Sequence, residues 1–238
     1  MREYKTDEKE LRLVKGIETA LIFANKEKNV LKQHYTEENF RYVVMNKISD
    51  VKCFGTFPNE NRKDNLLCFE KKYEKNTFYP DIVSIKYRSN GVNERINKIN
   101  PLVIELKINA PTTIADKRTI SNSNLPKDIQ KIKKMNSCIS TDLYKVRQYL
   151  KKVDDIQFEL GVVMNIGIPK EKKKEPTKDQ FLKYILELEC ILKLHQKEFS
   201  KETKSSKKLL FAWFNPLSNK PELFWLNQEK DIVLATKP

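Results

Sequence analysis

The sequence predicts an α/β protein in which helices flank a mixed β-sheet. Amphipathic helical patterns precede, interrupt and follow several short apolar segments of the kind that form strands. A sheet covered by helices is the arrangement that this alternation favours. The chain has 238 residues, 39% of them hydrophobic, which is enough to bury the core of one large domain. Nothing in the sequence separates two units, so we expect a single domain over residues 1–238.

Two amphipathic helices are predicted before the first strands. In residues 7–24, apolar side chains recur at three- and four-residue intervals between charges. The apolar positions are Leu11, Val14, Ile17, Leu21 and Ala24. A second helix is expected from Thr36, a good N-cap, to about Ile48. On that helix Glu37 falls on the inward stripe.

Three strands are expected next, over residues 66–73, 79–85 and 102–108, because apolar residues fill them and turn formers separate them. The turn formers between the last two include Gly91 and the pair Asn100-Pro101, which favours a hairpin. The later elements are a basic helix at 126–135, a helix at 141–152, a strand at 158–165, a helix at 180–199 and two strands at 209–214 and 222–226.

Charged residues in the predicted hairpin are its most informative feature. Strand side chains alternate, so Glu105 and Lys107 project from one face of an otherwise apolar strand. Burying them is costly unless they are paired or hold an ion. Asp81 on the neighbouring strand adds a second carboxylate, and two carboxylates suit a hard cation such as Mg²⁺. The alternative is an exposed ion pair on an edge strand, which the apolar neighbours disfavour.

Pro80-Asp81 followed by Glu105-Leu106-Lys107 resembles the PD-(D/E)XK nuclease superfamily in order, spacing and strand context. The resemblance covers about residues 36–165 and implies a restriction-endonuclease-like core with helical additions at both ends. It implies that Asp81, Glu105 and the Leu106 carbonyl bind Mg²⁺, with Mn²⁺ able to substitute. Lys107 would orient or deprotonate the attacking water and stabilise charge in the transition state.

The same resemblance suggests further site residues, each with a simpler alternative. In the resembled superfamily, the helix before the first core strand often points an acidic residue into the active site, and Glu37 is the candidate here. The alternative is that Glu37 only stabilises the positive N-terminal end of its helix. In the helix at 126–135, Gln130 and Lys131 could face the substrate, or lie on a solvated basic face.

Net charge indicates an anionic partner. Lys and Arg number 46 against 32 Asp and Glu, giving a formal charge of +14. This excess favours nucleic acid as a partner, and together with the nuclease resemblance we expect double-stranded DNA. The base composition of the genome could also enrich lysine. Basic residues expected to contact nucleic acid are Lys117, Arg118, Lys131 and Lys134.

The remaining composition excludes several classes of protein. The four cysteines have no paired metal-ligand spacing, which disfavours a zinc site and suggests a reducing compartment. Only two histidines occur: His34 is expected at the surface, and His195 in packing or capping of its helix. No segment approaches the ~20 apolar residues of a membrane span. We therefore expect a cytoplasmic protein.

These features together predict a Mg²⁺-dependent endonuclease that hydrolyses phosphodiester bonds of DNA. A type II restriction enzyme is one form that such an endonuclease could take, and it could act as a homodimer. Within the same superfamily, a recombination or repair nuclease and an RNA endonuclease are alternatives. A different class is a nucleic-acid-binding subunit that has the fold without turnover.

Overall fold

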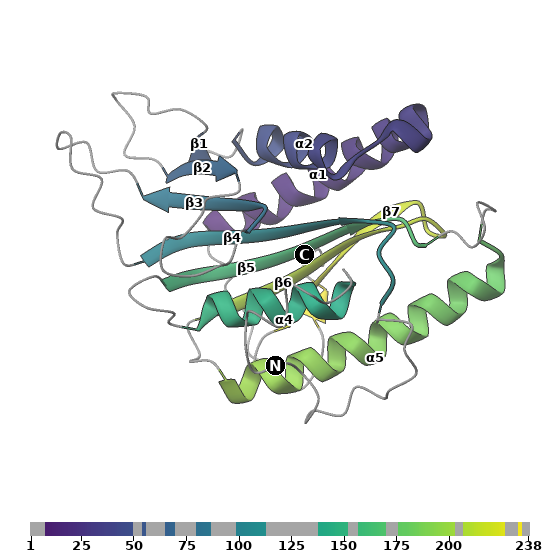
Figure 1. Ribbon diagram of the computed structural model, residues 1–238. Helices are drawn as coiled ribbons and strands as arrows, with labels where there is room; N and C mark the ends of the chain where they lie inside the picture. Colours follow the sequence, from purple (N-terminus) through teal and green to yellow (C-terminus); the bar gives the residue numbers. More distant parts are fainter. Residues whose placement is uncertain are drawn as a thin grey trace.

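A mixed β-sheet with helices on both faces forms the centre of the computed structural model (Figure 1). Residues 8–49, 54–55, 65–69, 80–86, 99–112, 138–151, 157–169, 176–202, 207–226 and 233–234 are described. The helices are α1 (Glu8–Leu31), the 3-10 helix η1 (Lys32–His34), α2 (Glu37–Ser49), α4 (Ile139–Leu150) and α5 (Lys178–Glu202).

The strands within the described residues form one eight-stranded sheet whose spatial order follows the chain. They are β1 (Phe54–Gly55), β2 (Asn65–Phe69), β3 (Ile82–Lys86), β4 (Ile99–Ile108), β5 (Gln157–Ile166), β6 (Lys208–Asn215), β7 (Lys220–Trp225) and β8 (Val233–Leu234). β2, β3 and β4 pair antiparallel, whereas β4, β5 and β6 pair parallel. The mixed sheet and its flanking helices confirm the predicted α/β class.

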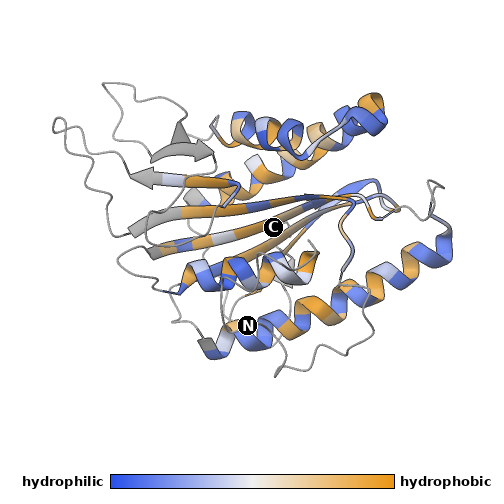
Figure 2. Cartoon of the chain, viewed as in Figure 1, coloured by the Kyte–Doolittle hydropathy of each residue, from blue (hydrophilic) through white to orange (hydrophobic). Residues whose placement is uncertain are grey.

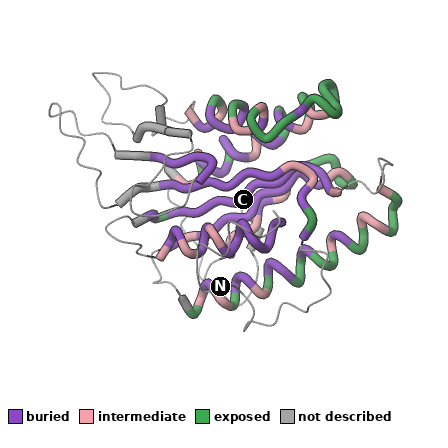
Figure 3. Tube along the Cα trace, viewed as in Figure 1, coloured by how far each residue is buried: buried purple, intermediate pink, exposed green. Residues whose placement is uncertain are grey.

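Each face of the sheet buries its own apolar core. α1 and α2 pack on one face and α4 and α5 cover the other (Figure 1). The central strands are orange along much of their length in Figure 2 and purple in Figure 3, because they are apolar and buried on both faces. β4 alternates as predicted: Leu102, Ile104 and Leu106 enter the core beneath α1 and α2, and Val103 enters the other core.

Helix ends follow from local hydrogen bonds. Thr36 caps α2, since its Oγ1 accepts a hydrogen bond from the Asn39 N–H at 3.3 Å. The Asn39 side chain reciprocates by accepting one from the Thr36 N–H at 2.9 Å. Cys138 plays the capping role for α4 by accepting a hydrogen bond from the Thr141 N–H at 3.4 Å, so α4 begins at Ile139, earlier than predicted.

Several sequence predictions need correction. Leu11 is 43% exposed, because the inward face of α1 is formed by Leu13, Val14 and Ile17 in that part of the helix. Asn100 and Pro101 lie inside β4 instead of a turn. β1 and β8 were not expected. The predicted helix at 126–135 and Glu70 to Tyr73 of the first predicted strand lie outside the described residues.

The register of the β3–β4 hairpin determines where the charged residues meet. Ile82 of β3 pairs with Ile104 of β4. Asp81, one residue before β3, therefore lies across from Glu105 on the neighbouring strand. The hairpin thus brings the two candidate metal carboxylates together although 24 positions separate them in the sequence.

A prediction concerns the packing of α4 on β5. A Cβ atom at Gly161 would lie 2.2 Å from Val146 Cγ1 and 3.0 Å from Leu150 Cδ1. Gly161→Ala should therefore destabilise the protein by about 1–3 kcal/mol, the usual cost of overpacking a core. Chemical denaturation measures the change, with Leu186→Ala at an exposed position of α5 as the control. An unchanged free energy of unfolding in Gly161→Ala would contradict this packing.

Candidate active site

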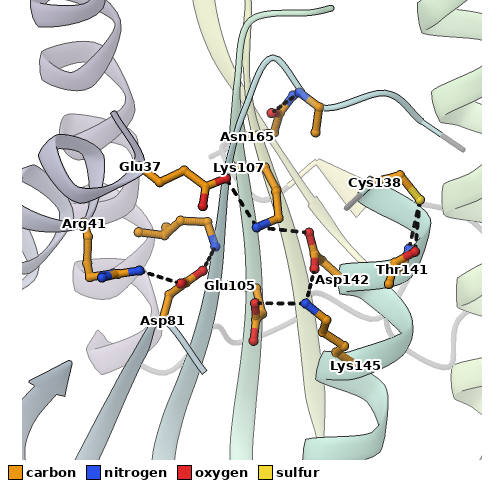
Figure 4. A network of polar contacts seen from close by, with 12 residues as sticks. Glu37, Arg41, Asp81, Glu105, Lys107, Cys138, Thr141, Asp142, Lys145 and Asn165 are labelled. Atoms are coloured by element: carbon orange, nitrogen blue, oxygen red, sulfur yellow. Dashed lines mark hydrogen bonds and ion pairs between the residues drawn. The ribbon is translucent and has the colours of Figure 1, made fainter. Parts of the chain in front are cut away.

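Charged side chains from two strands and two helices gather where β3 begins beside the middle of β4 (Figure 4). Acidic members are Glu37, Asp81, Glu105 and Asp142, and basic members are Arg41, Lys107 and Lys145. We call these seven residues the charge cluster. The hairpin supplies its centre, α2 supplies one wall and α4 the other.

Asp81 is fixed by two strong hydrogen bonds. The Leu106 backbone N–H donates to Asp81 Oδ2 at 2.7 Å, and Arg41 Nη2 donates to Asp81 Oδ1 at 2.8 Å. The first bond joins the start of β3 to β4, and the second joins the hairpin to α2. Asp81 therefore holds the hairpin and α2 in place, and it brings the Leu106 peptide next to a carboxylate. The role of the Leu106 carbonyl stays a prediction.

Lys107 lies between acidic groups of both helices. Its Nζ is 3.4 Å from Glu37 Oε1 and 3.8 Å from Asp142 Oδ2. The side chain of Lys107 is only 10% exposed, whereas that of Glu37 is 45% exposed. Glu37 thus reaches Lys107 from the first turn of α2, although the residue is exposed and does not lie on a buried stripe of the helix.

Helix α4 contributes residues that the sequence prediction missed. Lys145 Nζ lies 2.8 Å from Asp142 Oδ1 and 3.7 Å from Glu105 Oε2. The Tyr149 hydroxyl donates to Glu105 Oε1 at 3.2 Å. The spacing of 142, 145 and 149 puts all three on one side of a helix, which is a signal the sequence carried. Arg41, one turn after Glu37, was missed as well.

Burial and mutual repulsion perturb the acidic groups. The pKa of Glu105 is raised to about 8: burial is the largest cause, Asp81 and Asp142 add to the rise, and Lys145 and Lys107 oppose it. Burial likewise raises the pKa of Asp142. Burial alone would lower the pKa of Lys107, but Asp142, Glu37, Asp81 and Glu105 outweigh it, so this pKa is raised. Lys107 is therefore an ammonium at neutral pH.

The candidate metal ligands are carboxylate oxygens, which are the donors that Mg²⁺ prefers. Among the residues that the structure describes, no three His, Cys, Asp or Glu side chains form a ready metal-binding group. Mg²⁺ does not require three, because it commonly binds through one or two carboxylates and keeps several waters. Asp81 and Glu105 provide two. A divalent cation would offset the burial of the Glu105 carboxylate, which is the main cause of its raised pKa, and also its repulsion by Asp81.

The other predicted site residues are those expected to contact nucleic acid. Lys117, Arg118, Gln130, Lys131 and Lys134 lie outside the described residues. His34 is exposed, as expected. His195 is fully buried on α5, with its ring 3.0 Å from both Ser140 Oγ and Arg147 Nη1 of α4. Burial and Arg147 lower the pKa of His195 to about 3, so it is a neutral packing residue that ties α5 to α4.

Comparisons with protein-family models, with curated proteins and with solved structures give no significant match. Functional inference for this chain therefore depends on its own residues and geometry.

None of the helices in the described part of the chain is both long and apolar enough to cross a membrane.

A prediction follows from Glu105. Its pKa is about 8 in the folded protein against 4.5 when unperturbed, so between these pH values the folded state binds more protons than the unfolded state. Without metal, the free energy of unfolding should fall as pH rises from about 4.5 to 8, by at most ~1.4 kcal/mol per pH unit for this one proton.

The side chain that replaces Glu105 in Glu105→Gln is neutral at every pH. In this variant the free energy of unfolding should therefore fall less steeply between about pH 4.5 and 8. The measurement is urea denaturation in EDTA at several pH values, with the exposed Glu38→Gln as control. Identical pH dependence in wild type and Glu105→Gln would show that Glu105 is not held in a costly environment.

Proposed function

We propose that this protein is a metal-dependent endonuclease that hydrolyses phosphodiester bonds of DNA. The observation that carries the proposal is the meeting of Asp81, Glu105 and Lys107 at one point of an antiparallel hairpin. Two carboxylates and an ammonium in one buried place are the groups that attack on a phosphodiester needs. Their position on adjacent central strands of a mixed sheet supports a restriction-endonuclease-like core over about residues 36–165.

Asp81 and Glu105 would hold Mg²⁺ or Mn²⁺, with the Leu106 carbonyl as a further donor. When bound, the metal would polarise the phosphoryl oxygen and lower the pKa of a bound water. The Leu106 N–H bond to Asp81 Oδ2 orients one carboxylate, and the Tyr149 hydroxyl orients the other. Both carboxylates are thus held in fixed rotamers by neighbouring donors.

Lys107 stabilises charge in this proposal. As an ammonium it donates hydrogen bonds to a phosphate oxygen or to the attacking water and cannot itself remove a proton. Of the three roles expected from the sequence, orientation of the water and charge stabilisation are therefore favoured over deprotonation. Glu37 Oε1 lies 3.4 Å from the Lys107 ammonium and helps to hold it in place, while the Glu37 side chain stays open to solvent.

The charge of the chain favours a nucleic acid as the substrate, and within that class we propose DNA. The formal charge of +14 provides attraction to a polyanion, and a phosphodiesterase site gives that attraction a use. Recombination or repair nucleases and RNA endonucleases remain alternatives within the same chemistry. Each buried carboxylate is already paired with a cation of the protein. If no metal can displace these cations, the chain is instead a nucleic-acid-binding subunit without turnover.

A direct test compares two buried lysines. Lys107→Ala removes the ammonium and leaves both proposed metal carboxylates, so cleavage of supercoiled plasmid with Mg²⁺ should fall by about 100-fold or more. Lys207 is also buried, but it donates to the Phe158 carbonyl, outside the cluster. Lys207→Ala should keep full specific activity once folded, as circular dichroism would verify.

The assay uses plasmid, single-stranded DNA and RNA, each with Mg²⁺, Mn²⁺ or EDTA. Cleavage of RNA alone would replace DNA as the substrate. Full activity in folded Lys107→Ala, or activity of wild type in EDTA, would exclude the proposed mechanism.

Binding should also depend on salt. Each neutralised phosphate releases condensed counterions, so the DNA dissociation constant should rise steeply between about 50 and 200 mM salt. Removing charge at Lys117 and Arg118 together should reduce the slope of log affinity against log salt. Fluorescence anisotropy in EDTA, which separates binding from cleavage, measures it. An unchanged slope and affinity would place the DNA contact elsewhere.

A further inference from the structure

Lys145 has an unusual position within the charge cluster. It lies on α4 one turn after Asp142, and its ammonium is within 4 Å of two carboxylates from different elements, Asp142 and Glu105. The side chains of those acids are 0% and 3% exposed. Lys145 thus provides the positive charge shared by two buried acids that would otherwise repel each other (Figure 4).

The three side chains differ in their freedom to move. Glu105 projects from a central strand and is held by the Tyr149 hydroxyl, and Asp142 is in the first turn of α4. Lys145 is 25% exposed, so its long side chain has a path to solvent. Rotation about its side-chain bonds is therefore the motion that would carry its ammonium away from the carboxylates.

Asp142 also has unused capacity to bind a cation. Its Oδ2 atom is buried and makes no hydrogen bond, although Lys107 lies 3.8 Å away. A buried carboxylate oxygen without a hydrogen bond is costly, and a metal ion or its bound water would satisfy it. This observation is independent of the ion pairs of Lys145.

We propose that Lys145 is a built-in cation that occupies a Glu105–Asp142 cation site in the metal-free protein, and that a divalent cation displaces it. The inference deepens the proposed function by adding Asp142 to the metal-binding residues and by giving Lys145 a competing role. It explains how the buried carboxylates of Glu105 and Asp142 coexist before metal binds.

The first test measures Mg²⁺ binding without substrate. Lys145→Met keeps the length and apolar stem of the side chain but removes the competing charge. Its Mg²⁺ affinity by calorimetry at pH 8.5, where protons compete least for carboxylates, should exceed that of wild type by about tenfold. In EDTA its melting temperature should be lower than that of wild type, and Mg²⁺ should raise it more.

Two further variants and one control isolate the cause. In Lys145→Met/Glu105→Gln one repelling carboxylate is gone, so stability in EDTA should recover and the gain in Mg²⁺ affinity should disappear. Lys145→Arg retains a charge that binds carboxylates in a planar fork, so its Mg²⁺ affinity should not exceed that of wild type. Lys183→Met, at an exposed position of α5, should match wild type in both measurements.

Equal Mg²⁺ affinity and equal melting temperature in wild type and Lys145→Met would overturn the proposal. If Lys145→Met is unfolded in EDTA, recovery of its circular dichroism spectrum in Mg²⁺ supports the proposal, and failure to recover overturns it. These readouts are separate from cleavage. A wild type that cuts no nucleic acid refutes the proposed function, whereas the Mg²⁺ measurements alone decide the role of Lys145.

Discussion

The burial of Glu105 and Lys107 on a central strand is the constraint on which the rest of this structure depends. Ionised groups can stay buried only when partners replace the water they lose. The partners come from both sides of the sheet: Glu37 from α2, and Asp142 and Lys145 from α4. The charges on β4 therefore help to decide where two helices dock, and the same contacts build the candidate site.

The charge cluster contains groups that lower the stability of the folded protein and that a bound ligand would stabilise. Glu105 has a raised pKa, and an oxygen of Asp142 is buried without a hydrogen bond. An apolar core at this place would avoid both costs. Strongly perturbed acids that gather beside an ammonium are typical of sites where a ligand or a reaction uses them. A divalent cation and a phosphate are the ligands that this charge pattern would accept.

Local patterns predicted much of the fold and the centre of the site. Apolar runs bounded by turn formers gave the β3–β4 hairpin, and Thr36 marked the start of α2. Pro101 was predicted in a turn, but it fits in β4 because β3 pairs with β4 only from Leu102 onward. Asp142 and Lys145 were missed because charges on an amphipathic helix usually face solvent. Only the docking of α4 over β4 turns them inward, and the sequence does not specify that contact locally.

Anomalous diffraction from a crystal soaked in Mn²⁺ would show whether Asp81 and Glu105 form a divalent-cation site, because it locates the metal without reference to activity. We expect an anomalous peak within coordination distance of both carboxylates, at roughly 2.0–2.3 Å from their oxygens, and its loss in Asp81→Asn crystals. A Mn²⁺ peak elsewhere, or none at this position under saturating Mn²⁺, would show that the two carboxylates do not bind the metal together.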